Sequence, residues 1–187
     1  MAIAKGLRKF TDIFLKVFGV LATIAMIIMT IVILFQVIIR FSPINNIAWT
    51  EELSRFAFIW SSMLGAAIAY DRGSFASITM VPNALKGKAK WIFYFVVEIV
   101  VLLVAFIIIR YGFQLAIASS FMKTTALHAP MWIQYVPVPV GGIGIALSCI
   151  VHIVGMLTTG KLPKESDAQL REAIGEKEEE EGVEVSC

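Results

Sequence analysis

Titratable groups are scarce in this 187-residue chain, which has two histidines, two cysteines and 16% charged residues. It contains no Gly-rich phosphate loop, no metal-ligand grouping such as His-Glu-x-x-His and no plausible nucleophile and base. We therefore expect no catalytic site, no cofactor, no bound metal and no nucleic-acid partner. Cys149 and Cys187 leave no disulfide framework to interpret.

Apolar residues dominate instead, since 58% of the chain is hydrophobic and its mean hydropathy is +0.82. Soluble domains carry about 25% charged residues, so this composition indicates an integral membrane protein. A spanning helix needs about 20 predominantly apolar residues. The sequence therefore predicts an all-α membrane protein with four spans, at about residues 17–39, 53–70, 91–110 and 131–157.

Basic residues are concentrated in three places: before the first span, between the second and third, and after the fourth. The positive-inside rule then places both termini in the cytoplasm, and four spans satisfy that parity. The residues are Lys5, Arg8, Lys9 and Lys16; Arg72, Lys86, Lys88 and Lys90; and Lys161, Lys164, Arg171 and Lys177.

Segments outside the spans show two further patterns. Residues 1–16 and 74–89 have apolar residues at helix-like spacing, which predicts amphipathic helices lying at the inner membrane surface. Lys86, Lys88 and Lys90 would then meet anionic lipid. Residues 158–187 are highly charged and predict a disordered cytoplasmic tail. Aromatic residues suited to interfacial anchoring are Trp49, Trp91 and Trp132.

A charge cluster stands at the start of the second span. Glu51 is four residues before Arg55, and Glu52 is three residues before it, so on a helix both carboxylates can reach the same guanidinium. We favour a structural role for this cluster over direct contact with a transported ligand. Arg40 and Arg110, at the outer ends of the first and third spans, complete the group.

Among the polar residues inside the apolar spans, we single out three. Gln36 is most simply an interhelical hydrogen-bond donor. Glu98 and His152 could share a depth and pair. Glu98 is either a proton or cation site or a buried hydrogen-bonding group, and we favour the second interpretation.

Small residues predict where helices approach closely. Ser61, Gly65 and Ala69 repeat every four residues in the second span, which should be interior. The fourth span carries a similar group that includes Gly142 and Ala146. The third span is mostly bulky and should face lipid or a large apolar partner.

Several short strings follow one another along the chain: Trp49-x-Glu-Glu-x-Ser-Arg-Phe56, Trp60, Gly65-Ala-Ala67, Asp71-Arg-Gly73, Ala126-Leu127, Pro130-Met-Trp132, Tyr135 and Pro139-Val-Gly141. No single string is specific, but their order and spacing are. Together they resemble the small, Q-type membrane subunit of tripartite ATP-independent periplasmic (TRAP) transporters, over about Ile13 to Leu157. Ser74 and Phe75 replace the glycine and histidine common in the family, and the acidic tail is outside its pattern.

The resemblance implies a bacterial inner-membrane protein and a mechanical role. Its partners would be a large permease subunit of about twelve spans, which holds the substrate and sodium sites and moves as an elevator, and a periplasmic substrate-binding protein. The small subunit would enlarge the stationary scaffold and help dock the binding protein. The cargo would be an organic acid such as sialic acid or a C4-dicarboxylate, and nothing in the sequence identifies which.

Two alternatives remain open at this point. One is a self-contained four-span proton-coupled exporter that uses Glu98, although the chain lacks the inverted repeat and broken helices with which a transporter builds a midplane site. The other is an anchor subunit of a membrane enzyme, with His152 as a haem ligand.

Overall fold

The computed structural model describes residues 2–41, 48–72 and 88–159, and most of this part of the chain is helical. The helices are α1 (Ala2–Arg40), α2 (Ala48–Asp71), α4 (Lys88–Ala118), α5 (Trp132–Tyr135) and α6 (Pro137–Thr159). Within these ranges, four helical stretches are long and apolar enough to cross a membrane. The predicted all-α architecture with four spans is therefore confirmed.

Two segments singled out in the sequence fall largely outside the described residues. The inner interfacial segment 74–89 is described only at its last two residues, which belong to the start of α4. The charged tail is described only at residues 158 and 159, the end of α6. The expected orientation, with both termini in the cytoplasm, stays a prediction.

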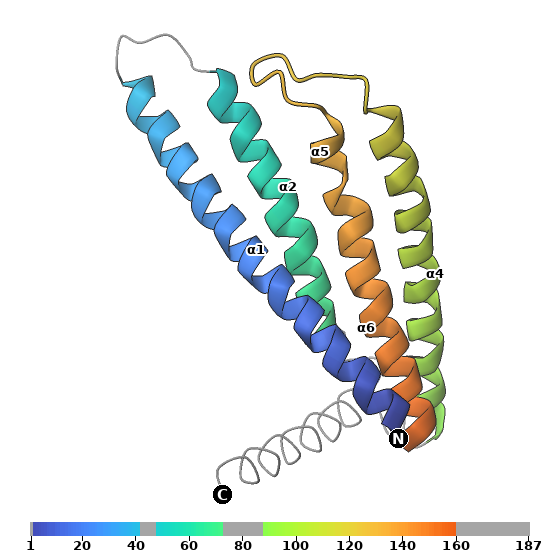
Figure 1. Ribbon diagram of the computed structural model, residues 1–187. Coiled ribbons are helices and arrows are strands. Elements are labelled where there is room, and N and C mark those ends of the chain that lie inside the picture. Colours follow the sequence, from blue (N-terminus) through green and yellow to red (C-terminus); the bar gives the residue numbers. More distant parts are fainter. Residues whose placement is uncertain (1, 42–47, 73–87, 160–187) are drawn as a thin grey trace, which may run out of the picture.

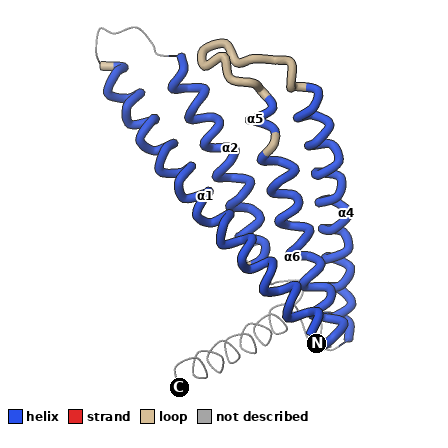
Figure 2. Tube along the Cα trace, in the orientation of Figure 1, coloured by secondary structure: helices blue, strands red, loops and turns tan. Residues whose placement is uncertain are grey.

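The four long helices lie side by side in the order α1, α2, α6 and α4 (Figure 1). Thus α2 packs between α1 and α6, while α4 packs on the far side of α6. A loop over residues 119–131 joins α4 to the short helix α5, and Figure 2 shows it in tan at one end of the molecule. Sequence neighbours are therefore not always neighbours in space, since α6 lies between α2 and α4.

Helix α1 is a single continuous helix of 39 residues. At 1.5 Å per residue it is about 58 Å long, nearly twice the thickness of the hydrocarbon core. The described part of the N-terminal segment, residues 2–16, therefore joins the first span without a break, and α1 must tilt or extend beyond the bilayer. Helix α4 also outruns its expected span of about 91–110, because its apolar sequence continues past Arg110 to Ala118.

The centre of the packing is α6, where half of the most apolar stretch is buried, against 11% for α1 and α4. Glycines on α6 allow its neighbours to pack this closely. A Cβ on Gly141 would lie 2.9 Å from the carbonyl oxygen of Met63 in α2, and one on Gly142 would lie 3.0 Å from Ile109 in α4. Such spacing lets the backbones of neighbouring helices approach closely.

The small-residue group on α2, which comprises Ser61, Gly65 and Ala69, is less closely packed. A Cβ on Gly65 would meet nothing within 4 Å, and Ser61 and Ala69 are only partly buried. Helix α2 is interior, as expected, but Gly65 is not a point of close helix contact within the described residues. The buried core of α1 and α2 is formed instead by Leu15, Phe18, Leu64 and Ala67.

The start of the fourth span contains two prolines, and the helix accommodates them with a small break. Helix α5 ends at Tyr135, and α6 begins at Pro137, a first-turn position where a missing N–H costs little. The backbone N–H of Val136 bonds to Trp132, and that of Val140 bonds to Val136, so hydrogen bonding continues through the break. Trp132–Thr158 can therefore act as one span.

Candidate functional site

Glu52, near the start of α2, holds the loop that joins α4 to α5. Its Oε1 accepts hydrogen bonds from the Thr125 hydroxyl at 2.9 Å and the Ala126 amide at 3.0 Å, and its Oε2 accepts from the Leu127 amide at 2.9 Å. An ionised carboxylate is acceptor-only, which suits three converging donors. The loop is closed on itself as well, because the Thr124 amide donates to Ala129 and the Met131 amide donates to Met122.

Arg55 pairs with Glu51 alone, at 3.3 Å, and the two side chains are 57% and 66% exposed. The expectation that both carboxylates share one guanidinium is therefore wrong, because Glu52 turns to the loop instead. Exposed pairs of this kind are worth about 0–1 kcal/mol. Within the described residues, neither Arg40 nor Arg110 pairs with a carboxylate. With the Gln114 amide oxygen turned toward it, Arg110 donates to that oxygen at 2.7 Å.

We expect Glu52→Gln to loosen the loop. The glutamine NH₂ must face one of the backbone N–H groups that the carboxylate now accepts from, which places two donors together. Exchange of the Ala126 and Leu127 amide hydrogens should become faster by about tenfold or more, as loss of a charge-assisted hydrogen bond implies. The matched control is Glu51→Gln, which contacts only exposed Arg55. Equal exchange rates in the two variants would show that Glu52 does not hold the loop.

A second polar cluster lies inside the helix layer and joins α2, α4 and α6. The Glu98 carboxylate of α4 accepts a hydrogen bond from the Tyr70 hydroxyl of α2. The Cys149 thiol of α6 lies 3.0 Å from Glu98 Oε2 and 2.9 Å from its backbone carbonyl oxygen. Nδ1 of His152, one turn further along α6, lies 3.0 Å from Glu98 Oε1.

The geometry of this cluster suits a structural contact. Glu98 and His152 are both buried, at 6% and 5% exposure, so each needs partners to offset the loss of water. A hydroxyl, a thiol and an imidazole surround the two carboxylate oxygens and supply those partners. The structure thus brings Glu98 and His152 together and adds Tyr70 and Cys149, which no sequence pattern singled out. Because the donors come from two other helices, the cluster ties α4 to both α2 and α6.

Glu98→Gln should leave assembly and transport close to wild type. Glutamine keeps an oxygen for Tyr70 and Cys149, and its NH₂ can donate to the imidazole in its other tautomer. Glu98→Leu should lower the melting temperature, because buried donors left unsatisfied cost about 1–3 kcal/mol each.

Both variants would be measured for thermal unfolding and for uptake driven by sodium and proton gradients. A stable Glu98→Gln assembly whose uptake no longer depends on a gradient would identify Glu98 as an exchanging carboxylate and overturn the structural interpretation.

The third polar contact is buried and was not expected. The Arg8 guanidinium of α1 makes two parallel bonds to Asp71 at the end of α2, at 2.9 and 3.1 Å, and its Nε lies 3.5 Å from Asp12. The Arg8 side chain is fully buried and that of Asp71 is 4% exposed. A weak signal existed in the sequence, since an acidic residue, Asp71, ends an apolar span.

The remaining residues singled out earlier lie where helices meet or at helix ends. Gln36 of α1 donates to the Thr50 hydroxyl of α2 at 3.0 Å, which is an interhelical bond. Trp49 and Trp132 are 40% and 42% exposed, while Trp91 stacks on Phe95 with ring centroids 5.2 Å apart. Lys90 is partly buried near the start of α4, Lys88 begins that helix, Ala146 lies partly buried on α6, and Lys86 is outside the described residues.

These features define a multi-pass membrane protein in which several buried polar groups join its own helices. Residues 29–159, the greater part of the chain, match the family described as "Tripartite ATP-independent periplasmic transporters, DctQ component". The chain therefore belongs to the family of TRAP transporter small permease subunits, one component of a tripartite system that also has a large permease and a substrate-binding protein. Membership of this family favours a transporter subunit over the two alternatives, a self-contained proton-coupled exporter and an anchor subunit of a membrane enzyme.

Curated relatives agree with the family match. The chain is 26% identical over 145 residues to a "Putative TRAP transporter small permease protein" of Haemophilus influenzae, covering 76% of this chain and 88% of the relative. It is 32% identical over 110 residues to the "Sialic acid TRAP transporter small permease protein SiaQ" of Vibrio cholerae, covering 58% and 63%. It is 26% identical over 120 residues to the "C4-dicarboxylate TRAP transporter small permease protein DctQ" of Rhodobacter capsulatus, covering 63% and 53%.

Proposed function

We propose that this chain is the stationary scaffold of a TRAP-type secondary transporter, beside a large permease subunit that binds the substrate and moves as an elevator. The observation that carries the proposal is the use of its intramembrane polar groups. Gln36, Glu98 and His152 all bond to side chains of other helices, and these contacts hold the helices to one another. A part that must stay still benefits from such cross-links.

The outer surfaces support a partner inside the membrane. Helices α1 and α4, at the two edges of the layer, expose long rows of bulky apolar side chains, for example Ile31, Leu103 and Phe106 at 60% or more. Lipid tails solvate such surfaces, and so does the apolar surface of a large membrane protein. We infer that one of these edges packs against the permease.

The loop held by Glu52 lies at the opposite end of the helices from the N-terminus (Figure 1). With both termini in the cytoplasm, the loop over residues 119–131 is periplasmic, where a substrate-binding protein can reach it. Its exposed Lys123 and the backbone order that Glu52 imposes suit a docking surface. The transported compound is an organic acid taken up with sodium, and the sialic acid and C4-dicarboxylate systems of the relatives suggest its class.

Reconstituted uptake tests this proposal. Proteoliposomes would contain the chain alone, the large permease of the same system alone, or both, each with the binding protein and a sodium gradient. We expect uptake only when both membrane subunits are present, because in this proposal the large permease binds the substrate and needs the support of the scaffold. Robust uptake by this chain alone would refute the scaffold role, and full uptake by the permease alone would refute the claim that the scaffold is required.

A further inference from the structure

A groove of about 570 Å³ lies between α1 and α2, near the N-terminal part of α1 and the end of α2. Its apolar walls come from Leu15, Val20 and Ile24 of α1 and Ile68 of α2. Thr23 also lines it, but its hydroxyl donates to the carbonyl of Gly19 on its own helix, at 2.8 Å. The hydroxyl is thus already hydrogen-bonded, and this part of the groove suits a hydrocarbon chain.

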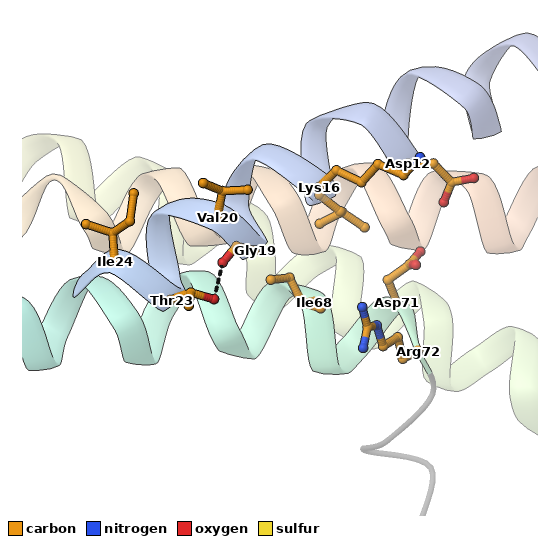
Figure 3. A pocket seen from close by; sticks show the side chains of 10 residues that line it. Asp12, Lys16, Gly19, Val20, Thr23, Ile24, Ile68, Asp71 and Arg72 are labelled. Atoms are coloured by element: carbon orange, nitrogen blue, oxygen red, sulfur yellow. Dashed lines mark hydrogen bonds between the residues drawn. The ribbon is translucent and has the colours of Figure 1, made fainter. Parts of the chain in front are cut away.

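Charged residues stand at one end of the same groove. Figure 3 shows Asp12 and Lys16 of α1 near Asp71 and Arg72 of α2, with Val20 and Ile24 further along. Arg8 bonds Asp71 with its two terminal nitrogens, and its Nε lies near Asp12, so its single positive charge offsets one of the two negative charges of these carboxylates. By contrast, within the described residues Lys16 and Arg72 form no ion pair, and both are exposed.

We propose that this groove binds a phospholipid with an anionic headgroup. The headgroup phosphate would lie between Lys16 and Arg72, and an acyl chain would follow the groove past Gly19 to Ile24. Ile24 lies eight residues beyond Lys16, a rise of about 12 Å along the helix, which accommodates the upper part of an acyl chain. Basic pockets between transmembrane helices on the cytoplasmic side are known to take such headgroups, and the positive-inside rule puts this end there.

Charge complementarity favours lipid over a protein helix as the occupant. A helix could fill the apolar walls, but it would need an acidic side chain at the depth of Lys16 and Arg72. Anionic lipid supplies that charge everywhere in the inner leaflet, at the level where helix ends meet headgroups. Exposed Val20 and Ile24, at 61% and 49%, would continue into the surrounding acyl chains.

Native mass spectrometry of the full chain in detergent tests the site. The probes are phosphatidylglycerol and phosphatidylcholine with identical acyl chains, together with inorganic phosphate. We expect phosphatidylglycerol to bind more tightly than phosphatidylcholine, and Lys16→Gln or Arg72→Gln to weaken it about fivefold each, the factor that corresponds to about 1 kcal/mol per basic residue. Gly19→Leu, whose side chain enters the groove beside Ile68, should weaken both lipids.

Lys123→Gln is the matched control, since this exposed cation lies in the loop at the other end of the helices. It should leave binding unchanged. Equal binding of the two lipids, or equal loss in the control, would overturn the proposal. So would inorganic phosphate that binds as tightly as phosphatidylglycerol, because the acyl chain would then contribute nothing. Variants that keep lipid binding but lose association with the large permease would instead assign the groove to a protein partner.

Discussion

Replacing Asp71 with asparagine should destabilise the folded chain by about 3–5 kcal/mol, the cost of breaking a buried ion pair by removing one partner. The Arg8 guanidinium is fully buried and would lose its bidentate carboxylate. Asp12, at 3.5 Å from Nε, compensates only in part. Thermal unfolding in detergent would detect this as a large fall in melting temperature.

Two further variants make the test specific. Arg55→Ala removes an exposed pair and should change the melting temperature little, so it is the matched control. The double variant Arg8→Leu/Asp71→Leu should recover much of the stability lost in the single one, because apolar residues of similar volume often replace a buried pair without loss. If the Asp71→Asn variant has the same melting temperature as the wild type, the ion pair between Arg8 and Asp71 is not a major contact between α1 and α2.

Gly141→Ala should also be strongly destabilising, by about 1–3 kcal/mol or more, because the added methyl would overpack the interface between α6 and α2. The Cβ would lie 2.9 Å from the Met63 carbonyl oxygen and 3.2 Å from its carbonyl carbon. These are backbone atoms, which cannot move aside as the end of a flexible side chain can. The helices would therefore have to separate.

Gly65→Ala is the matched control for this substitution. It makes the same chemical change inside a helix, but its Cβ meets nothing within 4 Å. Since alanine is the better helix former, this variant of the isolated chain should melt at or above the wild-type temperature. A fall in melting temperature of similar size in both variants would mean that close packing at Gly141 is not the cause. The same Gly65 variant, assayed with the large permease, would reveal whether this stripe packs against that subunit.

Some of the internal contacts could be predicted from sequence and others could not. Glu98 and His152 were the polar residues of two long apolar spans at comparable depths, so their pairing could be foreseen from length alone. Tyr70 and Cys149 gave no such signal, because a tyrosine at a span end and a cysteine inside a span are both ordinary in a membrane helix. Glu52 was recognised as part of a charge cluster, but the loop that it holds lies 73 to 75 residues further along the chain.

The sequence by itself determined the class of this protein and its family, because the length of an apolar run, the placement of lysine and arginine, and the order of short motifs are all local properties of the chain. The tertiary structure alone decided that α6 is the central helix and that Arg8 bonds to Asp71. It also decided that Glu52 accepts hydrogen bonds from the loop over residues 119–131 rather than pairing with Arg55. These outcomes depend on how each helix is rotated and how deep it sits. In a membrane protein that is apolar on nearly every helix face, the periodicity of the sequence does not encode that rotation, so only the packing of all four helices settles it.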